Sequence, residues 1–238
     1  QANAPQGKAG QWLIDPVDIT ISDDGTDYPN TTATKIKTAF LNEVLKSNDV
    51  IITTNRGGND KGIITVDGEI SVNSSNGVTL ALEANEAINI KHDISITGQE
   101  KNKLILITID DDSQINNQAK IDIGKGTLEI ITGLNGVLNV GSISADTVNI
   151  TAHTIKQAEG GTANPIKNLE LKQVNPDKSI YIGATSSSPT GAESIFDASL
   201  FASGGVFSQV RNLTLNAGRN QDIHLQDVDF QNANITAY

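Results

Sequence analysis

The chain has 238 residues and a formal net charge of −11 at pH 7, and its hydrophobic content of 37% includes only 4% aromatic residues. The acidic balance, without a strong lysine or arginine cluster, argues against nucleic acid and anionic membrane surfaces as partners. Cysteine is absent, so no disulfide holds the fold, and no apolar run reaches the roughly 18 residues that a membrane-inserted helix needs.

The first apolar stretch reads QWLIDPVDITI and contains the only tryptophan, Trp12. Pro16 cannot donate a ladder hydrogen bond, so it belongs at the start or the edge of a strand. We expect Asp15 and Pro16 to turn the chain into a first strand at 17–20, with Trp12 and Leu13 covering an apolar end or seam of the fold. The alternative is a tryptophan that stacks on a sugar, but no second aromatic residue is nearby.

One segment has helical periodicity, and we expect it to form a short amphipathic helix near residues 32–46. Its sequence is TTATKIKTAFLNEVLK, with Thr31 or Thr32 as the N-cap. The expected apolar stripe consists of Ile36, Ala39, Phe40, Val44 and Leu45. This stripe would lie against a face or an end of the strands. A second segment, 193–202, fits either a short helix or a loop followed by a strand.

From Val78 onward, short runs of Ile, Leu and Val alternate with polar residues, which is the period of a strand with one buried face. Segments this short at this spacing fit a β-sandwich or a parallel β-helix. A sandwich normally has longer strands, hairpin loops and core aromatics. Very short strands, aliphatic rows and abundant asparagine favour the parallel β-helix. We therefore expect an all-β fold in which each coil buries its apolar face against the next.

The run KLILITI at 103–109 is apolar on both faces of its expected strand. If Leu104 and Leu106 point inward, then Ile105, Ile107 and Ile109 point outward. These three isoleucines need cover. A loop or the helix of the same chain would be the simplest cover, and an assembly contact is the alternative.

Residues that carry chemistry are sparse. The densest carboxylate group, Asp110-Asp111-Asp112, is interpreted as a solvated turn, with a calcium-binding turn or a catalytic pair as alternatives. Residues 23–25 are interpreted as a turn as well. His92, His153 and His224 lack metal-ligand spacing and are expected at the surface. The sequence thus indicates no catalytic residue, no metal site and no cofactor.

Two stretches near the start of the chain resemble segments of large bacterial exoproteins of the filamentous haemagglutinin type, which are secreted by a two-partner system. The first is GKAGQWLIDPVDITI, and the second, after the expected helix, is NDVIITTNRGGNDKGIITVDGEI. The strand VTLALEA at 78–84 continues the likeness, and SIYIGA (179–184) and VRNLTLNAGRNQDI (210–223) look like shaft coils of the same proteins. The resemblance implies a right-handed parallel β-helix.

The resemblance also implies a role and a location. We expect one β-helix domain over 1–238, with an N-terminal segment at 1–54 that contains the helix and coils at 55–238. Because the chain begins at Gln1 without a signal peptide, it is expected to be a fragment of a larger exoprotein. The implied function is a non-enzymatic segment of a secreted adhesin on the bacterial cell surface. The implied partners are a host-cell glycan or protein, and the outer-membrane transporter of the parent protein.

Several alternatives stay open at this point. The fold class also includes carbohydrate-active lyases and glycosidases, which would need a carboxylate cluster on one outward face. A passive stalk for a distal toxin or binding domain is a third hypothesis. The expected contact surfaces are the loops 55–62, 98–103, 157–167 and 184–194. Glycosylation, known for some adhesins of this family, would use the Asn-x-Ser/Thr sequons, although composition alone explains their number: Asn30, Asn73, Asn149, Asn212 and Asn234.

Overall fold

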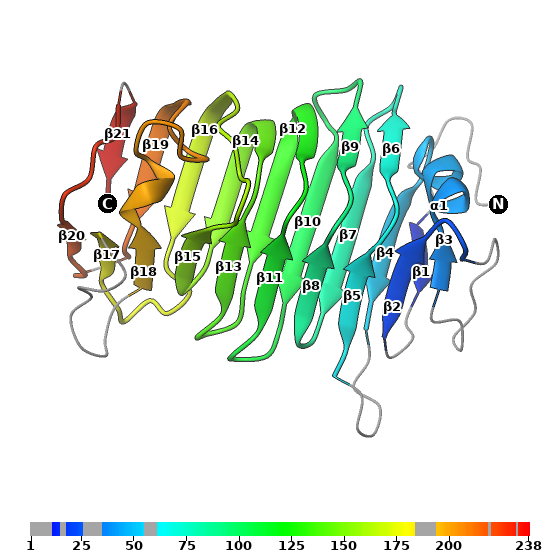
Figure 1. Ribbon diagram of the computed structural model, residues 1–238, viewed down its shortest axis with the longest axis horizontal. Helices are drawn as coiled ribbons and strands as arrows, with labels where there is room; N and C mark the ends of the chain where they lie inside the picture. Colours follow the sequence, from blue (N-terminus) through cyan, green and yellow to red (C-terminus); the bar gives the residue numbers. More distant parts are fainter. Residues whose placement is uncertain are drawn as a thin grey trace.

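The computed structural model describes residues 11–14, 18–25, 35–54, 61–183, 194–218, 220–231 and 233–238. Within these residues the chain is mostly β-strand and winds as a right-handed coil into an elongated rod (Figure 1). Strands β1 to β3 lie at one end of the rod, and β20 and β21 lie at the other. The expected all-β, right-handed parallel β-helix is confirmed.

The rod has two long parallel sheets, which we call face 1 and face 2. Face 1 has the strand order β1-β4-β7-β10-β12-β14-β16-β19-β21. Its strands are β1 (Gln11–Ile14), β4 (Asp49–Thr53), β7 (Thr79–Ala84), β10 (Lys103–Thr108), β12 (Ile121–Ile131), β14 (Ile143–Thr151), β16 (Ile166–Lys172), β19 (Val210–Asn216) and β21 (Asn234–Ala237).

Face 2 has the order β20-β17-β18-β15-β13-β11-β8-β5-β2-β3. Its strands are β20 (Ile223–Leu225), β17 (Ile180–Gly183), β18 (Ser194–Asp197), β15 (Thr154–Gln157), β13 (Val137–Val140), β11 (Gln114–Asn117), β8 (Ala87–Ile90), β5 (Ile63–Val66), β2 (Ile19–Ser22) and β3 (Lys35–Lys37). A shorter face 3 consists of β6 (Ile70–Asn73), β9 (Ile94–Thr97) and the first residues of β12 and β14.

The core is formed by aliphatic side chains that stack from coil to coil. On face 1, one inward position is occupied in successive coils by Leu80, Leu104, Leu128 and Val148, which are paired in register. All four are fully buried. Because neighbouring strands lie about 4.8 Å apart, each side chain contacts its equivalents above and below. Burial of each contributes about 1.5–3 kcal/mol, so aromatic residues are not needed to fill the core.

Buried polar side chains complete the corners of the coil. Asn102 lies between β9 and β10 and is 1% exposed. Its Oδ1 accepts a hydrogen bond from the Val78 amide at 3.0 Å, and its Nδ2 donates to the carbonyls of Thr97 at 2.8 Å and Ile96 at 3.4 Å. The side chain therefore joins two coils at a bend where the backbone ladder is interrupted.

The only α-helix in the described residues, α1 (Thr38–Leu45), is shorter than the sequence predicts. The helix was expected from residue 32 with a threonine cap, but Lys35–Lys37 forms strand β3, which pairs with β2. Ile36 is therefore a buried strand residue, and the N-cap is Lys37, with no side-chain cap. Thr31 and Thr32 lie outside the described residues. Strand pairing at the end of face 2 thus overrides the helical pattern before Thr38.

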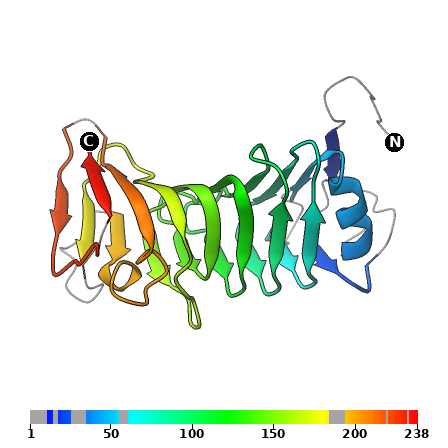
Figure 2. The ribbon, with the colours of Figure 1, turned by 90° about the horizontal axis from the view of Figure 1, so that it is seen from above.

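The buried side of α1 also differs from the expected stripe. Its buried residues are Thr38, Leu41 and Leu45, while Ala39 is exposed. The expected placement against an end of the strands is confirmed, because α1 packs against β6 at the N-terminal end of face 3 (Figure 2). There Asn42 Oδ1 accepts from the Ser71 amide at 3.1 Å. The helix thereby protects an edge strand that would otherwise expose its amides.

The opening stretch is only partly described. Trp12 and Leu13 lie in β1, where their backbones pair with Val50 and Ile51 of β4, and nothing is described of their side chains. Asp15 and Pro16 lie outside the described residues. The strand expected at 17–20 is β2, which begins at Ile19. The role of Trp12 as an apolar cover therefore stays a prediction.

Near the C-terminal end, strand order departs from chain order. Strand β18 follows β17 in the sequence but lies inside it, between β15 and β17. A short 3-10 helix, Ala198–Leu200, follows β18, so the segment expected at 193–202 is a strand and a helical turn. The next residues pack Phe201 against Phe207 and Phe230, with ring centroids 5.8 and 5.0 Å apart. These three aromatic side chains pack together in a part of the rod where face 3 has no regular strand.

Candidate functional site

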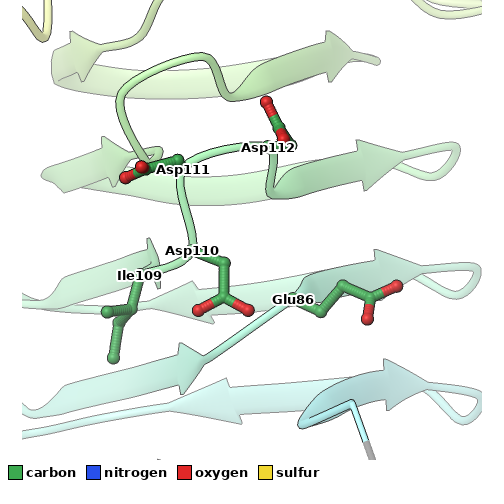
Figure 3. Close-up of a pocket in the computed structure, with 5 residues that line it drawn as sticks. All are labelled: Glu86, Ile109, Asp110, Asp111 and Asp112. Carbon is green, nitrogen blue, oxygen red and sulfur yellow. The ribbon is translucent and has the colours of Figure 1, made fainter.

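An open depression lies at the corner where the chain leaves β10 for face 2. It has a volume of about 500 Å³ and is lined by Glu86, Ile109, Asp110, Asp111 and Asp112 (Figure 3). The interpretation of residues 110–112 as a turn is confirmed: the Ser113 amide donates to the Asp110 carbonyl at 3.0 Å. Four of the five residues that line the depression carry a carboxylate.

The turn is held rigidly by the turn of the next coil. The amide of Asn135 donates to the Asp111 carbonyl at 2.6 Å, and Asn135 Nδ2 donates to Asp112 Oδ1 at 3.1 Å. Gly133 lies so close that a Cβ at this position would be 1.8 Å from the Asp110 carbonyl oxygen. A glycine is therefore required for the two turns to stack.

The four carboxylates do not converge on one point. Figure 3 shows Asp110 pointing toward the preceding coil, while Asp111 and Asp112 point away from it. Glu86 accepts a hydrogen bond from Lys61 Nζ at 2.9 Å, and this contact raises the pKa of Lys61. Among the described residues, no group of three or more histidine, aspartate or glutamate side chains could hold a metal ion. In Figure 3 these carboxylates do not face one another, whereas a glycosidase mechanism uses a facing pair.

Outward aliphatic side chains adjoin this acidic corner. Leu104 and Leu106 are buried and Ile105 and Ile107 are half-buried on the outer surface of face 1, so the expected orientation of the 103–109 strand is confirmed. Ile109 is 56% exposed at the corner. The helix does not cover these residues, because α1 packs on β3, β4 and β6.

The corner of the next coil adds an apolar residue that the sequence analysis missed. Leu134 is 46% exposed, and its turn stacks on the turn that begins at Ile109. Ile131 lies beside Ile107 in the strand register. The adjacency of the two turns follows from the pairing of β10 with β12, which the sequence alone does not specify.

A second open depression, of about 390 Å³, lies on the outer surface of face 2. It is lined by Asn116, Gln118, Asn139, Gln157, Ala158 and Glu159. Asparagines on this surface form a ladder: Asn139 Nδ2 donates to Asn116 Oδ1 at 2.6 Å, and Asn116 Nδ2 donates to Asn89 Oδ1 at 2.9 Å. The resulting surface is flat and rich in side-chain amides. The sequence shows the asparagines, but their alignment depends on the strand register.

The histidines are scattered over the rod. His92 and His224 are exposed, as expected, whereas His153 is half-buried between β14 and β15. The ring Nδ1 of His153 lies 3.0 Å from Thr154 Oγ1. Burial, and secondly the nearby Lys178, lower the pKa of His153 below its ordinary value. The folded protein therefore favours the neutral imidazole.

This shift predicts a loss of stability in mild acid. A histidine with a lowered folded pKa contributes its full stability above the unfolded pKa of about 6.5, and loses it as the pH falls toward the folded pKa. We expect thermal unfolding measured between about pH 7.5 and pH 5.5 to show a smaller decrease in Tm for His153→Gln than for the unchanged chain. Equal decreases would contradict the assignment, and His92→Gln serves as the exposed control.

The sequons occupy different environments. Asn73 at the end of β6 and Asn234 in β21 are exposed. Asn149 is half-buried on the outer surface of β14. Asn212 is also half-buried and donates through Nδ2, the atom that a glycan would modify, to Asn168 Oδ1 at 2.9 Å. Asn30 lies outside the described residues.

Of the four loops expected to contact a partner, the structure fully describes 98–103 and 157–167. Residues 55–60 and 184–193 lie outside the described residues. The loop 98–103 is a tight turn between β9 and β10. The loop 157–167 packs back on the rod, where Gln157 Oε1 accepts from the Val206 amide at 3.2 Å.

Comparison with known proteins adds no assignment: no family model, no curated protein and no solved structure matches the chain. In the described residues, no helix is long and apolar enough to cross a membrane.

Proposed function

We propose that the chain is a non-enzymatic shaft segment of a large secreted bacterial adhesin, of the filamentous haemagglutinin type that its opening stretch resembles. The observation that carries the proposal is the stack of parallel strands, whose buried apolar side chains form one cluster that includes residues from Ile19 to Ala217. Such a stack makes a stiff rod whose outer surface is a repeating array of strands and turns. Its location would be the bacterial cell surface.

The binding mode that suits this surface is weak contact at many points. The depression at the corner after β10 and the depression on face 2 are both open rather than enclosed. The amide-lined depression on face 2 offers hydrogen-bond donors and acceptors to the hydroxyl groups of a host-cell glycan, or to the polar surface of a host protein. Display of many copies would raise the apparent affinity by roughly 10²–10⁴-fold.

The test is binding of the chain to host epithelial cells and to a glycan array, in monomeric form and coupled to beads. We expect the beads to bind and the monomer to bind weakly. The double variant Gln118→Ala, Asn139→Ala should reduce bead binding, and Thr214→Ala on the outer surface of face 1 should not. Failure of the beads to bind any cell or glycan would contradict the adhesive role and favour a passive stalk. Cleavage of an array glycan would favour a carbohydrate-active enzyme instead.

A further inference from the structure

The outer surface of face 1 and its corner carry an apolar patch, which consists of Ile105, Ile107, Ile109, Ile131 and Leu134. Ile109 and Leu134 are 56% and 46% exposed, and the other three are half-buried as outward strand residues. The patch spans the neighbouring coils of β10 and β12, which are paired in register. It lies in the middle of the rod, away from both ends (Figure 1).

The patch does not continue into the later coils of this surface. The positions that continue the row of Ile107 and Ile131 in later coils are Thr151, Lys172 and Asn216. In later coils the row of Ile105 continues with Glu129, Asn149, Glu170 and Thr214, whereas in the two preceding coils it continues with Ala81 and Ile51. The same strand geometry therefore accepts polar side chains, and folding alone does not require isoleucine at these outward positions.

Acidic residues border the patch on the side of face 2. Glu83 pairs with Ile107 in the strand register, and the turn at 110–112 follows Ile109 directly. None of the ion pairs in the described part of the chain involves Glu83, Asp111 or Asp112. The lysine nearest to the patch by sequence, Lys103, is paired with Glu129 at 2.5 Å. The acidic border thus keeps an excess of negative charge.

This charge distribution selects among the possible occupants. A second copy of the chain, itself with a net charge of −11, would bring one acidic border against another. An anionic lipid surface would be repelled in the same way. A partner with aliphatic side chains flanked by cations complements both the patch and its border.

We propose that the apolar patch and its acidic border dock a cationic amphipathic segment of another protein, with its leucines or isoleucines on the patch and its lysines or arginines on Glu83, Asp111 and Asp112. The aliphatic contact removes apolar area from water, and the border charges speed and orient the encounter. This surface is separate from the amide-lined depression on face 2.

The test uses two fluorescein-labelled peptides as probes, LKKLLKLLKKLLKL and the same sequence with every lysine replaced by glutamate. Binding to the chain is measured by fluorescence anisotropy at low and high salt. We expect the cationic peptide to bind and the acidic peptide not to bind, with weaker binding at high salt. The border variant Glu83→Gln, Asp111→Asn and the patch variant Ile107→Thr, Leu134→Ser should each weaken binding about tenfold.

Matched controls separate docking from general attraction to an acidic chain. Glu159→Gln, Asp146→Asn removes two charges elsewhere, and should leave binding within about twofold of the unchanged chain. Circular dichroism checks that each variant is folded. Equal weakening by the control pair, or binding unaffected by the patch variant, would overturn the proposal. A dimer in sedimentation equilibrium that Ile107→Thr abolishes would also overturn it, because a second copy would then be the occupant.

Discussion

Replacement of Leu128 by alanine is expected to lower the free energy of unfolding by about 2–5 kcal/mol. Leu128 is fully buried and lies in register between Leu104 and Val148 of the neighbouring coils. The spacing of the coils is fixed by the hydrogen-bond ladders on either side, so the stack cannot collapse to fill the space that the substitution leaves. The loss therefore includes a cavity contribution as well as the lost burial.

The outward neighbour on the same strand provides the control. Ile131 is half-buried on the outer surface of β12, and Ile131→Ala is expected to change stability by about 1 kcal/mol or less. Urea unfolding followed by circular dichroism gives both free energies and shows whether the m-values stay equal. A larger loss at Ile131 would mean that the inner and outer surfaces of face 1 are assigned the wrong way round, and equal losses would contradict the difference in burial between the two positions.

The fold was predictable where side-chain alternation decides the outcome. Leu104 and Leu106 point inward and Ile105 and Ile107 point outward, because a strand has a period of two and only one side can face the core. Sequence alternation and short strand length together favour stacked coils over a sandwich. These signals are local, and a single coil contains them.

The errors arose where pairing with distant residues overrides a local pattern. The segment around Ile36 has helical spacing, but the partner strand β2 draws residues 35–37 into face 2. The reversed order of β17 and β18 was not predictable, because IYIG and SIFD fit either position equally well.

In the candidate site, too, the local features were predictable from the sequence and the contacts between coils were not. The turn at 110–112 was predictable from its three aspartates, but the directions of their side chains were not. Leu134 and Ile109 belong to different coils, and their proximity depends on how the two turns stack. A feature of this kind requires the register, which the sequence alone does not specify.

Replacement of Asn102, the buried asparagine at the corner between β9 and β10, is also expected to lower the free energy of unfolding. Asn102→Leu keeps a similar volume but removes every hydrogen bond of the side chain. The Val78 amide then loses its acceptor and the Ile96 carbonyl loses a donor, while the Thr97 carbonyl keeps its hydrogen bond from the Ser74 amide at 2.9 Å. Because an unsatisfied buried group costs about 1–3 kcal/mol, we expect a loss of about 3 kcal/mol in the free energy of unfolding.

An asparagine on the outer surface of face 2 provides the control, because it tests whether the loss at Asn102 depends on burial. Asn139 donates to Asn116, but its side chain is only half-buried, so water can replace the lost partner after Asn139→Leu. We expect this change to lower stability by less than about 1 kcal/mol in the same urea measurement. If Asn102→Leu unfolds at the same urea concentration as the unchanged chain, the corner asparagine does not join the coils, and the turn between β9 and β10 is held by its backbone alone.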